Sequence, residues 1–120
     1  MSIKKIDITI PKKDYQLIRL SIKENDVPKQ LGENDLLFFT VAKSPDTTDY
    51  IFQKSLENGI IYDSSANKYL VEINSQDTQD LELNTTYGYD ITIYYDGNKP
   101  KQKVIGSFRI SDKFTMNEVG

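Results

Sequence analysis

The fold of this 120-residue chain is indicated most clearly by the stretch Thr86-Tyr87-Gly88-Tyr89-Asp90-Ile91-Thr92-Ile93-Tyr94-Tyr95. Bulky residues alternate with small or polar ones along it, and a period of two is typical of a β-strand with one buried face. We expect that face to carry Tyr87, Tyr89, Ile91 and Ile93. A turn at residues 96–98 and a second alternating stretch at residues 104–110 follow, so the two strands should close a hairpin at an edge of a β-sandwich.

Shorter alternating stretches precede this hairpin, separated by turns rich in Asn, Asp, Gly or Pro. Strands are expected at residues 6–10, 15–23, 36–41, 49–56, 59–62 and 69–73. One helical turn is expected at residues 76–81, with the hydroxyl of Ser75 as its cap. The pattern predicts an all-β fold with one domain over residues 1–120 and a tail after about residue 114. Its architecture should be an immunoglobulin-like antiparallel β-sandwich of seven or eight strands, with a small barrel as the alternative.

The composition excludes several classes of function. The chain contains neither Cys nor His, which removes the thiol and imidazole groups that most nucleophiles, proton shuttles and zinc sites use. The formal net charge of −3 has the wrong sign for a protein that neutralises phosphates with clustered Lys and Arg. We therefore expect no enzymatic activity, no cofactor and no nucleic-acid partner.

Acidic residues occur in close pairs within the predicted turns. Calcium binds about six to eight oxygen atoms from loops of this kind, but the repeating calcium-loop pattern is absent. Acids in turns are mostly solvated or cap the backbone. We therefore expect no metal site at these pairs, which are Glu24 and Asp26, Glu33 and Asp35, Asp46 and Asp49, and Asp77 and Asp80.

The start of the chain, Met1-Ser2-Ile3-Lys4-Lys5, is charged like the start of a signal peptide. The apolar core that should follow is short and interrupted by Asp7. No apolar run approaches the ~20 residues of a membrane-spanning helix. We expect a protein with no membrane partner that stays in the cytoplasm until it is assembled into a larger structure.

Several segments, taken in their order along the chain, carry a resemblance to a known group of proteins. They are Ile6-Asp7-Ile8-Thr9-Ile10, Asn34-Asp35-Leu36-Leu37-Phe38-Phe39-Thr40-Val41, Gln53-Lys54-Ser55-Leu56-Glu57-Asn58-Gly59-Ile60, Asp77-Thr78 with Leu81, Tyr87-Gly88-Tyr89-Asp90-Ile91 and Gly106-Ser107-Phe108-Arg109-Ile110. This order resembles small immunoglobulin-like β-sandwich proteins of Gram-positive phages and prophages, encoded among tail, baseplate and neck genes. Residues 83–86 depart from the Pro-x-Gly-like corner of that group. The resemblance implies a non-enzymatic structural or adaptor protein of a virion, whose partners are other virion proteins or further copies of itself.

Three residues are candidates for a protein interface. If Leu37, Phe39 and Val41 face the core, alternation turns Leu36 and Phe38 to the opposite face of the same strand. An exposed apolar patch usually marks a protein contact, although a loop or the first strand could also cover these two side chains. Alternation likewise turns Tyr94 away from the buried face of its strand. The possible interface therefore consists of Leu36, Phe38 and Tyr94.

A second hypothesis assigns the chain a different class of function. Tyr side chains together with loop acids can bind sugars, so a carbohydrate-binding or adhesion module for a cell-surface glycan is the alternative. The ordinary interpretation is that each ring packs into a half-buried strand and leaves its hydroxyl at the rim. The tyrosines concerned are Tyr50, Tyr62, Tyr69, Tyr87, Tyr89, Tyr94 and Tyr95. Lys99, Lys101 and Lys103 are expected to protect a strand edge from aggregation.

Overall fold

A computed structural model describes residues 2–3, 8–11, 15–43, 50–95 and 99–111 of the chain. The fold is all-β, with one short helix, and this confirms the expected fold class. The strands and the helix are β1 Ser2–Ile3, β2 Ile8–Pro11, β3 Gln16–Leu20, β4 Ile22–Glu24, β5 Val27–Pro28, β6 Leu36–Ala42, β7 Tyr50–Leu56, β8 Gly59–Asp63, β9 Lys68–Ile73, α1 Ser75–Thr78, β10 Thr86–Tyr95 and β11 Lys99–Ser111.

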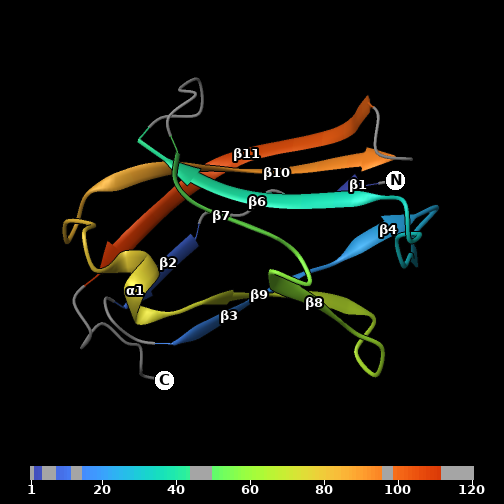
Figure 1. The fold of residues 1–120 in the computed structure, drawn as a ribbon, viewed down its shortest axis with the longest axis horizontal. Helices are drawn as coiled ribbons and strands as arrows, with labels where there is room; N and C mark the ends of the chain where they lie inside the picture. Colours follow the sequence, from blue (N-terminus) through green and yellow to red (C-terminus); the bar gives the residue numbers. More distant parts are fainter. Residues whose placement is uncertain (1, 4–7, 12–14, 44–49, 96–98, 112–120) are drawn as a thin grey trace.

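The strands form two packed layers joined by one strand. Eight strands bond in the order β2-β11-β10-β6-β7-β8-β9-β3, and a small second sheet has the order β1-β4-β5. In Figure 1, β6, β10 and β11 lie along one side of the molecule and β3, β9 and β8 along the other, while β7 crosses between them. The sheet therefore folds over at β7 and encloses the core as a sandwich.

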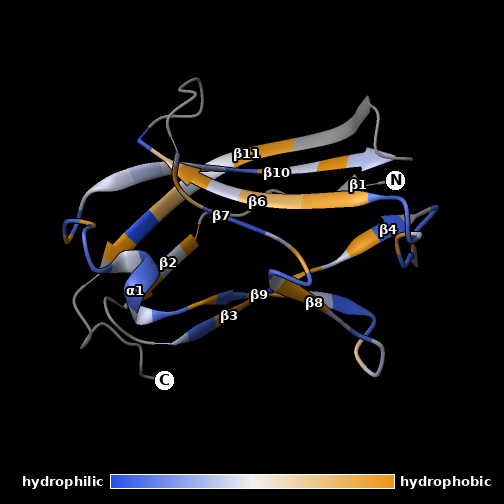
Figure 2. Cartoon of the chain, in the orientation of Figure 1, coloured by the Kyte–Doolittle hydropathy of each residue, from blue (hydrophilic) through white to orange (hydrophobic). Residues whose placement is uncertain are grey.

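The core follows from the alternation of the strands. The inward residues of β6, Leu37, Phe39 and Val41, are buried at 1%, 0% and 0% exposure, and the inward residues of β10 are buried with them. Phe39 stacks on Tyr89 at 5.4 Å between ring centroids and contacts Phe108 edge-on at 6.4 Å. Figure 2 shows hydrophobic residues along β6 and within β3 and β9, which face each other across this core. The predicted inward face of residues 86–95 is therefore correct.

The stretch predicted as one strand over residues 15–23 is two strands. The chain leaves the bonded ladder at Ser21, so that β3 pairs with β9 while β4 pairs with β1 and β5. Asn25 and Asp26 both have positive φ, 54° and 64°, and form a tight turn between β4 and β5. This break and the short strands β1 and β5 explain why the described residues contain eleven strands rather than seven or eight.

The hairpin of β10 and β11 is not at an edge of the sheet. β10 pairs with β11 on one side and with β6 on the other, and β11 also pairs with β2. The pairs β2–β11 and β7–β8 are parallel, so the sandwich is not purely antiparallel. The sequence predicted both strands of the hairpin but not their outer neighbours, because β2 and β6 are distant from the hairpin along the chain. The predicted turn at residues 96–98 lies outside the described residues.

The helix begins one residue earlier than expected. Its N-cap is Asn74, not Ser75, because the Asn74 side chain accepts hydrogen bonds from the backbone N–H groups of Gln76 and Asp77. The Asp77 carboxylate accepts the Asn74 backbone N–H in return at 2.9 Å. This reciprocal pair is a capping box. The same Asp77 carboxylate forms an ion pair of 2.8 Å with Lys54, so the cap also ties α1 to β7.

Candidate functional site

The three candidate interface residues lie together on the outer face of the sheet. The β6–β10 register places Tyr94 opposite Leu36 and Thr92 opposite Phe38. The rings of Phe38 and Tyr94 contact each other at 5.8 Å with an interplanar angle of 88°, an edge-to-face arrangement. We call Leu36, Phe38 and Tyr94 the outer patch. The sequence alone does not predict that these three side chains lie together, because this depends on the register between β6 and β10.

The outer patch is partly exposed, and a row of polar residues borders one end of it. Leu36 is 40% exposed, and Phe38 and Tyr94 are half-buried. Beyond Phe38, the register places Gln53 of β7, Thr40 of β6 and Asp90 of β10 side by side. The Gln53 amide donates to the Thr40 hydroxyl at 3.0 Å, and the Asp90 carboxylate accepts the Thr92 hydroxyl at 3.2 Å. Apolar side chains bordered by satisfied polar groups are common in protein contact surfaces.

The tyrosines do not form one platform. Tyr69, Tyr87 and Tyr89 are buried in the core, Tyr62, Tyr94 and Tyr95 are half-buried, and Tyr50 is exposed. The Tyr87 hydroxyl accepts the Glu82 backbone N–H at 3.0 Å, and the Tyr69 hydroxyl accepts that of Leu31 at 2.7 Å. These two rings pack inward and their hydroxyls fix neighbouring backbone, which agrees with the ordinary interpretation of tyrosine in a strand.

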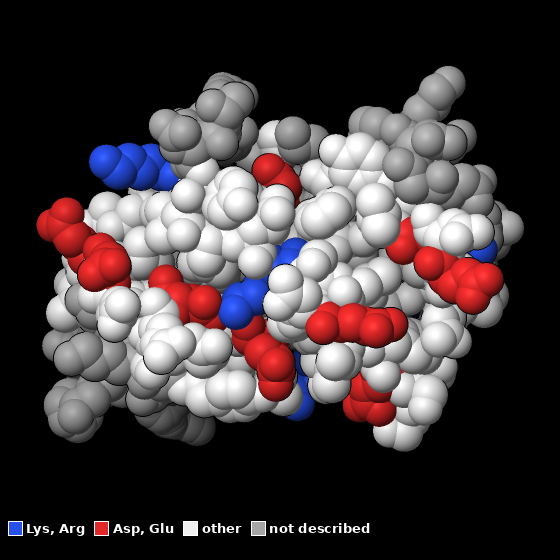
Figure 3. Space-filling model, in the orientation of Figure 1, with Lys and Arg blue, Asp and Glu red and all other residues white. Residues whose placement is uncertain are grey.

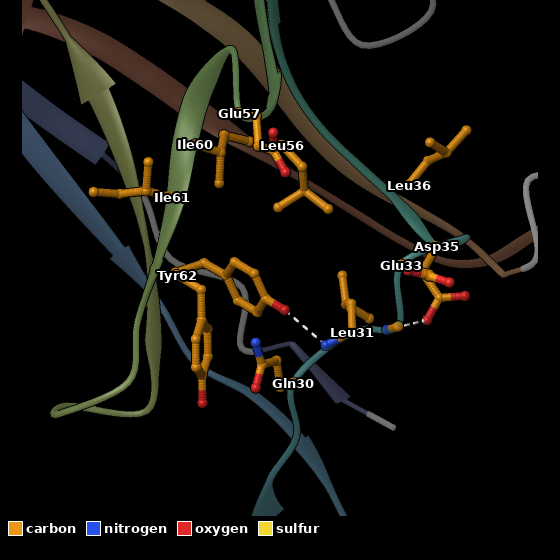
Figure 4. A pocket seen from close by; sticks show the side chains of 12 residues that line it. Gln30, Leu31, Glu33, Asp35, Leu36, Leu56, Glu57, Ile60, Ile61 and Tyr62 are labelled. Atoms are coloured by element: carbon orange, nitrogen blue, oxygen red, sulfur yellow. Dashed lines mark hydrogen bonds between the residues drawn. The ribbon is translucent and has the colours of Figure 1, made fainter.

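A groove opens where the two layers separate, between the segment preceding β6 and the strand β8 (Figure 4). We call it the edge groove; its volume is about 530 Å³. Leu31 and Ile60, both buried, contribute apolar side chains to its floor, and Leu56 lies beside them. Its lining residues are Gln30, Leu31, Gly32, Glu33, Asp35, Leu36, Leu56, Glu57, Ile60, Ile61, Tyr62 and Tyr69.

Hydrogen bonds hold one wall of the edge groove in place. The Tyr69 hydroxyl reaches across to the Leu31 backbone N–H, drawn as a dashed line in Figure 4. The Asp35 carboxylate accepts the Gly32 backbone N–H at 2.7 Å, and the Gly32 carbonyl accepts the Asp35 N–H. Burial raises the pKa of Tyr69, and the bond from Leu31 acts in the opposite, weaker sense. These hydrogen bonds therefore preorganise the wall of the groove.

Acidic side chains give the edge groove its charge. Glu33, Asp35 and Glu57 line it, and no Lys or Arg is among its lining residues. In the orientation of Figure 3, acidic side chains predominate over the part of the surface where β8 and the segment before β6 lie. The groove therefore favours a ligand that carries positive charge.

The acidic pairs that sequence singled out have local roles where they are described. Asp26 is a turn residue with positive φ, Asp35 bonds Gly32, and Asp77 caps α1 and pairs with Lys54. In the described ranges, no group of three or more acidic side chains is arranged to hold a metal ion. Asp46 and Asp49 lie outside the described residues, as do the tail after residue 114 and the side chains of Lys99, Lys101 and Lys103.

Asp63 shows how these turn acids act. Its carboxylate accepts the Ser65 hydroxyl at 2.7 Å and the Ser65 backbone N–H at 3.1 Å. The bond from the Ser65 hydroxyl is the largest cause that lowers the pKa of the Asp63 carboxyl. The carboxylate therefore stabilises the turn between β8 and β9, which is a structural role.

No protein-family model matches the chain, and a search of curated proteins finds no similar sequence. Among the described residues, the structure contains no helix with the length and apolar character that crossing a bilayer requires. The candidate sites therefore rest on the geometry of the chain itself.

Sequence reasoning did not find the edge groove. Its two walls come from residues 30–36 and 56–62, and only the folding over of the sheet at β7 brings them together. The signals present in the sequence were the acidic pair Glu33 and Asp35 and the tyrosines Tyr62 and Tyr69. No spacing along the chain links these residues, so the sequence does not show that they share a site.

Proposed function

We propose that this chain is a non-enzymatic structural or adaptor protein of a phage or prophage particle, and that it acts through protein–protein contacts at the outer patch. The observation that carries the proposal is the contact between Phe38 and Tyr94 beside the exposed Leu36 on a rigid sheet. When a partner covers exposed apolar side chains of this kind, the free energy of the system falls. The resemblance of the collinear segments to phage sandwich proteins supports the virion assignment.

The chemistry of the described surface supports a binding role rather than a catalytic one. The chain lacks Cys and His. Asp77 caps α1 and pairs with Lys54, and Asp35 bonds the Gly32 backbone in the wall of the edge groove. The outer patch, in contrast, has no polar group of its own beyond the Tyr94 hydroxyl. Its partner should therefore present a complementary apolar surface, either on another virion protein or on a second copy of the chain.

The test is to replace Leu36 and Phe38 with Ser in one variant and measure association. Sedimentation of the isolated protein reports self-association, and co-purification with co-expressed products of neighbouring structural genes reports a partner. Association should be lost while the circular dichroism spectrum and Tm stay near those of the wild type. Ile105→Ser is the matched control, because Ile105 is also 40% exposed but lies on β11 outside the patch. Equal association of the wild type and the double variant would refute the proposal.

A further inference from the structure

The strand β8 lies between β7 and β9 in the sheet order, but part of its β7 side is open and faces the edge groove. β8 pairs with β9 along residues 60–63, whereas its pairing with β7 stops at Ile60. Beyond Ile60, therefore, the described residues provide no strand on that side of β8. A strand edge of this kind offers main-chain donors and acceptors to another chain.

The direction of the free backbone groups follows from one hydrogen bond. The Ile60 carbonyl accepts the Glu57 backbone N–H at 2.8 Å and so points away from β9. Backbone groups of a strand alternate sides with a period of two. The N–H and carbonyl of Tyr62 consequently point the same way as those of Ile60, toward the open side that adjoins the groove.

The edge groove supplies the other elements of a peptide-binding site. Leu31, Leu56 and Ile60 offer an apolar surface beside the open strand edge, and a volume of about 530 Å³ lies within the range of ~300–1,000 Å³ usual for ligand pockets. Strand addition obtains affinity from main-chain hydrogen bonds and specificity from pockets for alternate side chains. The acidic residues Glu33 and Glu57, both exposed, lie on opposite walls and complement a basic side chain.

We propose that the edge groove binds an extended peptide segment of a partner protein, which carries Lys or Arg next to apolar residues and adds as a strand to the open edge of β8. This site goes beyond the proposed function. It shares Leu36 with the outer patch but includes neither Phe38 nor Tyr94, so substitution of Phe38 alone distinguishes the two sites. The segment's backbone bonds Tyr62, its apolar side chains contact Leu31 and Ile60, and its cation lies between Glu33 and Glu57.

The experiment selects ligands from a yeast-displayed library of random peptides of about nine residues, with the purified full chain as bait. Peptides that bind should be enriched in Lys or Arg beside apolar residues. Their affinity should fall at least about tenfold, about 1.4 kcal/mol, for the double variant Glu33→Lys/Glu57→Lys. The matched control is Asp80→Lys/Glu82→Lys, which makes the same change in net charge at exposed positions away from the groove and should bind like the wild type.

The strand-addition geometry has its own readout. In a selected peptide, N-methylation of the amides that face β8 should abolish binding, whereas N-methylation of the alternate amides should leave it nearly unchanged. The Tyr62 amide should exchange more slowly with solvent when the peptide is bound. Three outcomes would overturn the proposal: no enriched peptide, selected peptides that the charge-reversed groove variant binds equally well, or equal sensitivity to both sets of N-methyl groups. Phe38→Ser should not affect any of these measurements, which separates this site from the outer patch.

Discussion

The ring of Tyr89 on β10 lies directly over Gly106, its cross-strand partner on β11. A Cβ at Gly106 would come within 2.4 Å of the Tyr89 ring, far inside van der Waals contact. An aromatic ring that covers a glycine on the neighbouring strand fixes strand register, because the space exists at one position only. The ring of Tyr89 and the missing side chain of Gly106 therefore help to fix the register of β10 and β11.

Gly106→Ala tests this relationship. The added methyl group must displace the Tyr89 ring from its stack on Phe39, and overpacking of this kind costs about 1–3 kcal/mol of unfolding free energy. Urea denaturation measures the loss. Gly32→Ala is the control, because a Cβ there meets its nearest atom at an ordinary 3.4 Å. Equal stability of the two variants would show that the packing of the Tyr89 ring does not require a glycine at position 106.

The two faces of the hairpin should respond differently to the same substitution. Ile91→Asn places an amide at a site of 1% exposure, where the lost apolar contacts and the buried polar group together cost roughly 3 kcal/mol or more. Ile105→Asn, at a site of 40% exposure on β11, should cost far less. Thermal unfolding of both proteins gives the comparison. A larger loss of Tm for the Ile105 variant would mean that the inward and outward faces are assigned the wrong way round.

The cap of α1 provides a local test. Asn74→Ala removes the acceptor of two backbone N–H groups and should lower the unfolding free energy by about 1 kcal/mol. Ser75→Ala, one residue later in the helix, should change it little. If the Ser75 variant were the less stable of the two, the cap expected from sequence would be correct after all.

Alkaline pH should act on the wall of the edge groove. Burial raises the pKa of Tyr69 in the folded state, so the folded protein holds this proton more tightly than the unfolded chain. The corresponding stability is complete below the unfolded pKa of about 10 and is lost as pH rises through the folded pKa. Tyr69→Phe should be less stable than the wild type at pH 7. As the pH rises above about 9, however, its unfolding free energy should fall less than that of the wild type. Urea denaturation at a series of alkaline pH values measures both curves. A Tyr69→Phe curve parallel to that of the wild type over this range would contradict the expectation.

Sequence predicted the parts of this fold that depend on local alternation. Ile18, Leu20 and Ile22 are buried as their spacing required, and so are the inward residues of β9 and β10. Alternation does not identify the inward face of β7, because Lys54 occupies an inward position opposite Phe39. Its charge is compensated by Asp77, which belongs to another element and is not visible in any local pattern.

The sites were predictable only in part, for the same physical reason. Alternation identified the outward direction of Phe38 and Tyr94, but their contact depends on the β6–β10 register. The edge groove depends on the place where the sheet folds over, which is set by how much apolar surface both layers bury together. The cap at Asn74 was missed because two adjacent residues, Asn74 and Ser75, can both accept backbone N–H groups, and only the position of the first helical residue decides between them.

The proposed function requires this chain to be incorporated into a virion through the outer patch. The most direct measurement is quantitative mass spectrometry of particles purified after induction of the host that encodes it, with the wild type and Leu36→Ser/Phe38→Ser compared. We expect the wild-type chain to be present in a fixed ratio to the other structural proteins and the folded double variant to be absent from otherwise intact particles. Absence of the wild-type chain from the particles, or equal incorporation of both proteins, would contradict it.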